Sequence, residues 1–139
     1  MKKAKAVILL LILCGCSMAG DLVVAANSNF PVSSLSKKMI KKIYLDKIRF
    51  LKGKKIYPIN MSGKSPLRAR FEKNILNMPR TELERYWLKS HYMGHRPPKV
   101  LKSKEAVALF LQKVDNSLGY LDKTTAEEFG LKILYESDR

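Results

Sequence analysis

A short segment between a predicted strand and a predicted helix carries the side chains best suited to binding an anion. They are Ser62, Gly63, Lys64, Ser65 and Arg68. Ser65 is a natural N-cap because its hydroxyl can accept a hydrogen bond from a backbone N–H one turn on. Free N–H groups at the positive end of a helix dipole attract anions, and Gly63 lets a ligand approach the backbone. The segment therefore predicts an anion site.

A simpler interpretation also explains these residues, as a well-capped helix with a solvated basic first turn. Arg68 favours the anion site, because a cation in the first turn opposes the helix dipole. An anion in front of Arg68 would reverse that penalty.

The composition indicates a single strongly basic domain. The 139 residues hold 27 Lys and Arg against 12 Asp and Glu, a formal charge of +15. Such a surplus suits an inorganic anion, nucleic acid, anionic lipid or a cell-wall polymer, although scattered lysines also serve solubility alone. Nucleic acid is not expected as a partner, because the aromatic residues fall at core spacings and are not interleaved with the basic ones.

Residues 1–19 are predicted to be a signal peptide, because three lysines precede an apolar run too short to span a bilayer. Cleavage before Gly20 competes with a lipobox-like sequence, Leu13–Cys16, in which Cys16 would be lipidated. Either route predicts an exported, periplasmic protein that attaches to a membrane only if Cys16 carries lipid. Residues 20–139 would then form the mature domain, with 24 basic and 12 acidic residues and a charge of +12.

The residues that most enzymes need are not arranged for catalysis. Both cysteines lie in the predicted leader, and no serine stands in a Gly-x-Ser-x-Gly elbow. Gly63-Lys64-Ser65 lacks the upstream glycine of a P-loop. His91 and His95 are four residues apart, but two histidines alone leave a zinc site short of ligands. We expect no enzyme activity, no cofactor and no metal.

Strand and helix patterns alternate, which predicts an α/β domain with a mostly parallel sheet. Strands are expected near Leu22–Ala26, Ile56–Asn60, Leu118–Leu121 and Leu131–Tyr135. Ligands of such sheets bind beyond the carboxyl ends of the strands. Asn27 and Ser28, after the first strand, and the segment at Ser62 are therefore expected at one edge.

Local signals place the helices between these strands. Ser36 and Ser103 are expected N-caps, like Ser65, and Thr81 with Glu84 has the spacing of a capping box. Tyr86 and Trp87 are interpreted as core residues.

The order of several motifs resembles a known family. They are Asn27–Ser36, Ile43–Lys47, Ile56–Ile59, Ser62–Arg68 with Phe71, Tyr86-Trp87, Gly94 with Pro97-Pro98, and Ser117–Asp122. Together they resemble small exported relatives of the phosphate-binding proteins of ABC transporters, in the periplasmic binding protein-like family. The resemblance implies a single three-layer lobe of the type II fold.

In that family, phosphate is held between two lobes, partly by a serine-glycine-threonine turn at a helix N-terminus. Ser62, Gly63 and Ser65 resemble that turn, and the Asn27-Ser28 loop resembles a segment near the hinge. Asn60 and Met61 stand where relatives usually have an arginine and an aspartate.

Two functions follow as expectations. The first is an exported phosphate or oxyanion binder that holds its anion at Ser62–Arg68 and works with an ABC transporter or an envelope partner. With one lobe the anion would be half exposed, and each contact would contribute roughly 0–1 kcal/mol. The second is an envelope interaction protein without a transport role, which docks an acidic partner, membrane or polymer through its basic surface.

Overall fold

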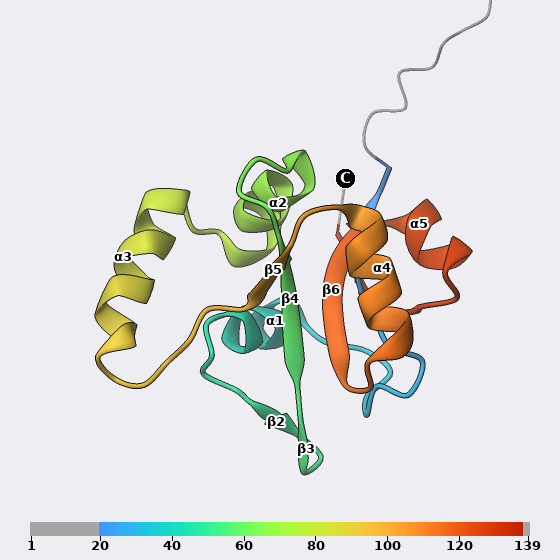
Figure 1. Ribbon diagram of the computed structural model, residues 1–139, viewed down its shortest axis with the longest axis horizontal. Helices are drawn as coiled ribbons and strands as arrows, with labels where there is room; N and C mark the ends of the chain where they lie inside the picture. The colour runs from blue at the N-terminus through green and yellow to red at the C-terminus, as the bar shows by residue number, and fades with distance from the viewer. Residues whose placement is uncertain (1–19, 138–139) are drawn as a thin grey trace, which may run out of the picture.

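A five-stranded sheet forms the centre of the computed structural model, which describes residues 20–137 (Figure 1). The strands lie in the order β5 (Lys99–Leu101), β4 (Tyr57–Met61), β6 (Ser117–Asp122), β1 (Leu22–Ala26) and β7 (Lys132–Glu136). Every residue of β1 is fully buried. The predicted signal peptide and Cys16 fall in residues 1–19, outside the described residues.

Strand directions confirm a mostly parallel sheet but correct the role of its first strand. β4 is parallel to β5 and to β6, whereas β1 is antiparallel to both of its neighbours, β6 and β7. Leu22 pairs with Asp122 and Ala26 with Leu118. The buried apolar run predicted a strand covered on both faces, and coverage does not fix direction.

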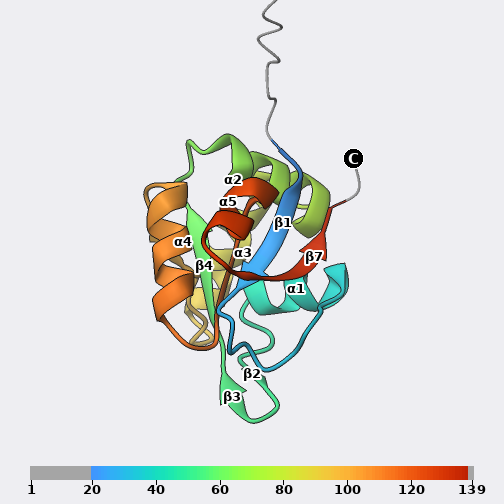
Figure 2. The same ribbon diagram turned by 90° about the vertical axis from the view of Figure 1, so that its right-hand side faces the viewer.

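Helices cover the two faces of the sheet, which gives the predicted three layers (Figure 2). On one side lie α1 (Lys37–Tyr44), α2 (Pro66–Phe71) and the π-helix η1 (Glu72–Leu76), and on the other lie α4 (Lys104–Lys113) and α5 (Lys123–Glu128). Consecutive residues of β6 show both contacts. The Tyr120 ring stacks on Phe71, with centroids 4.0 Å apart, and Gly119 lies against Val107 and Leu111.

Two further elements stand outside these layers. α3 (Arg80–His91) lies at the left of Figure 1, and β2 (Phe50–Leu51) with β3 (Lys54–Lys55) forms a hairpin below the sheet. No helix within residues 20–137 combines the length and the apolar character needed to cross a membrane.

The predicted serine caps are confirmed at three helices. Ser36, Ser65 and Ser103 accept hydrogen bonds from the backbone N–H groups of Met39, Arg68 and Ala106, over 3.2, 3.3 and 3.0 Å.

The predicted start of α3 is wrong, and so is one predicted core residue. α3 begins at Arg80 after Pro79 without a side-chain cap, so Thr81 lies inside the helix. Pro79 takes the N-cap position itself, with a φ of −62° and an extended ψ of 152°, so the helix begins one residue before Thr81. Tyr86 packs against the core and donates to the carbonyl of Leu45 over 2.6 Å, but Trp87 is only half-buried and outside the core.

Candidate anion-binding site

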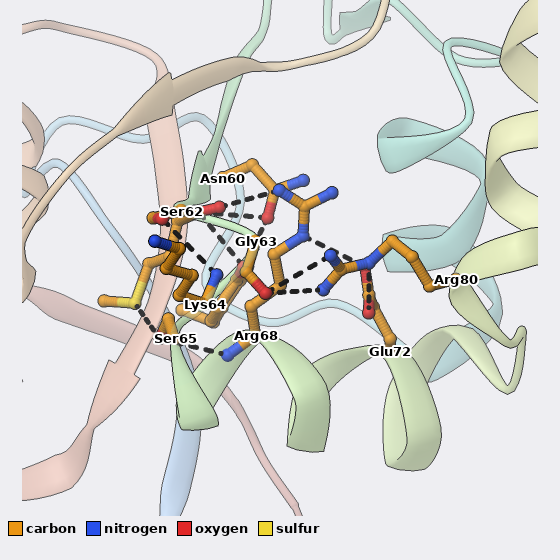
Figure 3. Close-up of polar contacts among 10 residues, drawn as sticks. Asn60, Ser62, Gly63, Lys64, Ser65, Arg68, Glu72 and Arg80 are labelled. Carbon is orange, nitrogen blue, oxygen red and sulfur yellow. Dashed lines mark hydrogen bonds and ion pairs between the residues drawn. The ribbon is translucent and has the colours of Figure 1, made fainter.

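The segment that follows β4 is closed by its own hydrogen bonds (Figure 3). Ser65 N–H donates to the carbonyl of Ser62 over 2.9 Å, and Lys64 N–H to the Ser62 hydroxyl over 3.4 Å. Among the hydrogen bonds of residues 20–137, the N–H of Gly63 has no acceptor. Gly63 and Lys64 are exposed, whereas Ser62 and Ser65 are half-buried. The five predicted residues from Ser62 to Arg68 therefore lie together at the end of β4.

A nearly buried carboxylate lies beside this segment and binds two arginines. Glu72, with a side chain 8% exposed, accepts from Arg68 Nε over 3.0 Å. It also accepts from Arg80 Nε, which lies 2.9 Å from Oε1 and 2.8 Å from Oε2. The hydrogen bond to Glu72 raises the pKa of Arg80 above its usual range, so the guanidinium stays charged. One negative charge thus holds two positive charges next to Ser62 (Figure 3).

The two guanidinium groups also bind backbone carbonyls on either side of Ser62. Arg68 Nη1 donates to Met61 O over 2.8 Å, and the two terminal nitrogens of Arg80 donate to Gly63 O over 3.2 and 3.3 Å. A Cβ on Gly63 would lie 2.8 Å from Arg80 Nη1, closer than real contacts allow. Glycine therefore leaves room for Arg80 at this carbonyl, and a larger residue would push the flexible end of the arginine side chain aside.

Sequence reasoning missed Glu72 and Arg80. The i, i+4 spacing of Arg68 and Glu72 on one helix was an available signal. Arg80 carried none, because it comes from the start of α3 and reaches a carbonyl 17 residues earlier in the chain.

A buried tyrosine supports the segment from inside the sheet. Tyr120 OH donates to Asn60 Oδ1 in a very short hydrogen bond and accepts from Met61 N–H over 3.1 Å. Asn60 Oδ1 accepts from the same N–H over 3.0 Å. Burial raises the pKa of the Tyr120 phenol well above its usual range, so the hydroxyl stays a donor. These bonds fix the residues that precede Ser62.

The other two predicted site residues, Asn27 and Ser28, lie at the opposite end of the sheet. Asn27 N–H donates to Ser117 O over 3.0 Å, at the start of β6, because β1 runs antiparallel. The buried Asn27 side chain donates to Leu111 O over 2.8 Å and so caps the end of α4, while Ser28 is exposed. The expectation that both loops share one edge of the sheet is therefore wrong.

The two histidines each face a basic or ion-paired neighbour. His91 Nδ1 lies 3.1 Å from Arg96 Nη1, and His95 Nδ1 lies 3.2 Å from Asp46 Oδ2. Within the described part of the chain, no three His, Cys, Asp or Glu side chains are grouped so that they could hold a metal ion.

The central sheet with helices on both faces matches the periplasmic binding protein-like fold of solved phosphate receptors. A phosphate ABC transporter substrate-binding protein from Clostridium perfringens with bound phosphate superposes with a TM-score of 0.67 at 18% identity. PstS from Borrelia burgdorferi gives 0.66 at 21%, and an ABC-type phosphate transport receptor from Vibrio cholerae gives 0.65 at 16%. Each match covers 82% of this chain.

The chain spans less than half of these proteins, namely 45%, 44% and 46% of the Vibrio, Clostridium and Borrelia chains. At such identities the likeness shows the fold. No protein-family model matches the sequence, and no curated protein matches it. The chain thus has the fold of part of a phosphate receptor, as the order of its motifs predicted.

Proposed function

We propose that this chain binds an inorganic oxyanion, phosphate first of all, at the segment from Ser62 to Arg68. The observation that carries the proposal is the pair of arginines that Glu72 holds beside an exposed segment with an unused N–H at Gly63. The fold likeness supports it, because the similar substrate-binding protein from Clostridium perfringens holds bound phosphate.

The available donors fit a tetrahedral oxyanion on an open surface. The N–H of Gly63, the hydroxyl of Ser62 and the ammonium of Lys64 lie within one short segment. Arg68 uses its Nε and Nη1 for Glu72 and Met61, which leaves Nη2 as a donor for a ligand. With Glu72 counted, Lys64, Arg68 and Arg80 leave a local charge of +2, the sign an oxyanion requires.

The role is binding for uptake or sensing, without chemistry on the ligand. The three similar solved structures are transport receptors or substrate-binding proteins. Export to the periplasm and delivery to an ABC transporter are part of the same proposal.

Isothermal titration of the domain with phosphate, and with sulfate as the control anion, tests the proposal at moderate salt. We expect saturable phosphate binding that weakens at least about tenfold when Ser62→Ala removes a donor and Lys64→Gln removes a positive charge. Ser28→Ala is the matched control, because that exposed serine lies at the opposite end of the sheet. Equal binding by all three proteins would overturn the assignment to this segment, and no heat with either anion would overturn the function.

A further inference from the structure

Large apolar side chains at the end of α3 are exposed and do not pack into the core. Leu88 is 69% exposed, Tyr92 85% and Met93 69%. Leu88 lies on α3, and Tyr92 and Met93 follow its last residue, His91; the three together are called here the α3 apolar face. Trp87 lies beside it, half-buried and in edge contact with Tyr86. Figure 1 shows α3 at the outer left of the molecule, away from the sheet.

The same stretch of chain is basic throughout. Residues 85–104 contain six Lys and Arg and two His but no Asp or Glu, although the whole chain has 12 acidic residues. Four of the seven large apolar side chains that are exposed within residues 20–137 also fall in this stretch. Arg85 and Lys89 flank the apolar face on α3 itself, and both are exposed.

We propose that the α3 apolar face docks onto a bilayer surface that contains anionic lipid. The free energy falls when exposed leucine, methionine and aromatic side chains enter the boundary of the acyl chains. Tyrosine and tryptophan suit that boundary because one end of the side chain is apolar and the other polar. Lysine and arginine at the rim keep their charges at the headgroups while their stems cover apolar surface. The apolar side chains and the basic residues around them therefore both favour an anionic bilayer as the partner of this face.

A second copy of this chain fits the face less well. A copy would bring the same basic stretch against this one, and like charges across an interface oppose association. The oxyanion segment and the α3 apolar face are separate surfaces, so membrane docking does not depend on phosphate binding.

Trp87 offers a built-in probe, because it is the only tryptophan of the chain. The protein to use is residues 20–139, since all core residues of the described fold lie between Leu22 and Leu134 and the apolar run of residues 1–19 would bind lipid itself. Mixed with phosphatidylcholine vesicles that contain phosphatidylglycerol, it should cosediment, shift its emission to the blue and be quenched by brominated acyl chains. Pure phosphatidylcholine vesicles should bind it at least about tenfold more weakly.

Two sets of variants separate the apolar and the charged contributions. Leu88→Ser with Tyr92→Ser and Met93→Ser should lower the partition coefficient about tenfold or more, whereas Phe50→Ser, at a site 58% exposed, should not change it. Arg85→Gln with Lys89→Gln should lower it about fivefold for each charge, and Lys37→Gln with Lys38→Gln on α1 serves as the charge-matched control.

Three outcomes would overturn the proposal. They are unchanged Trp87 emission with anionic vesicles, equal binding to neutral and anionic vesicles, and equal losses in the test and control variants. Sedimentation equilibrium tests the alternative that a second copy of this chain binds the face. A dimer that the triple serine variant abolishes, without vesicle binding, would assign the face to a second copy.

Discussion

Arg80 and Glu72 form an ion pair in which a single nitrogen, Arg80 Nε, contacts both oxygens of a nearly buried carboxylate. It lies 2.9 Å from Oε1 and 2.8 Å from Oε2. The pair joins the start of α3 to η1, and Arg68 adds a second cation on the same carboxylate. An acidic group in a proposed anion site opposes the ligand by charge while it positions the cations that would bind it. These two effects can be separated.

Glu72→Gln should lower stability and raise oxyanion affinity together. The amide keeps the shape but loses the charge that holds two arginines, and we expect a loss of about 2 kcal/mol in the free energy of unfolding. This is less than for a fully buried pair because the Arg80 side chain is 33% exposed. Removal of one negative charge near the segment should tighten phosphate binding by up to about tenfold.

Urea denaturation and calorimetric titration of the same protein check the two effects. Glu82→Gln, at an exposed position of α3, is the control and should change neither. Weaker phosphate binding by Glu72→Gln would show that the carboxylate only positions the arginines and that its charge does not matter.

Gly63→Ala tests whether Arg80 must reach the segment. The new Cβ would lie 2.8 Å from Arg80 Nη1, so the flexible end of that side chain must move off the Gly63 carbonyl. Because the carboxylate contact of Arg80 can persist, we expect only about 0.5–1 kcal/mol of destabilisation. A phosphate dissociation constant at least about threefold higher would indicate that Arg80 helps to place the anion, whereas an unchanged constant would separate Arg80 from the site.

The sequence predicted best the features that short-range geometry determines. A serine cap joins two groups only three residues apart, so it does not depend on distant parts of the chain. Ser36, Ser65 and Ser103 all form this contact. Apolar runs likewise located the strands. The order of the motifs predicted the overall fold, which the solved structures confirm.

Features set by long-range pairing were not predictable in this way. The direction of β1 depends on β6 and β7, which lie at the other end of the sequence, and this direction separates Asn27 from Ser62. Arg80 was missed for the same reason, since its partners are set by where α3 begins relative to η1. Side-chain chemistry alone does not report such distances.

Tyr120→Phe should loosen the residues that precede the proposed site. The hydroxyl accepts from Met61 N–H and donates to Asn60 Oδ1, and its removal leaves buried polar groups with fewer partners. We expect a loss of about 1–2 kcal/mol in the free energy of unfolding. Tyr44→Phe is the matched control, because it also removes a buried tyrosine hydroxyl that bonds β4. The Tyr44 hydroxyl donates to Ile59 O over 2.8 Å, one residue before Asn60. Only the Tyr120 variant should also weaken phosphate binding.

Alkaline pH should destabilise the fold through the same two tyrosines. Burial raises the pKa of Tyr44 and of Tyr120 above the value near 10 of an exposed phenol. A raised folded-state pKa means that the unfolded chain loses these protons first. The stabilisation is therefore complete below about pH 10 and is lost as pH rises toward the folded-state values. Urea midpoints measured across this range should fall with pH, less steeply in either phenylalanine variant, and equal slopes in all three proteins would contradict the assignment.

Asp46→Asn should remove an acid-sensitive contact that holds the loop after α3. Partial burial raises the pKa of Asp46, but hydrogen bonds from Arg49, the Arg96 N–H and His95 outweigh burial and leave the pKa below its usual range. A lowered folded-state pKa gives stability that is present above about pH 4 and is lost as pH falls through the folded-state value.

Asparagine suits this position because Asp46 has a φ of 60°, which asparagine tolerates as well as aspartate does, so the substitution changes charge with little backbone strain. We expect a loss of about 1 kcal/mol at neutral pH and a shallower fall of stability in acid. Asp115→Asn is the control, because Asp115 is an exposed aspartate whose carboxylate accepts a 3.4 Å hydrogen bond from the Asn29 amide, away from Asp46. Acid unfolding that is identical in the wild type and Asp46→Asn would show that the contacts of Asp46 with Arg49 and His95 do not stabilise the loop.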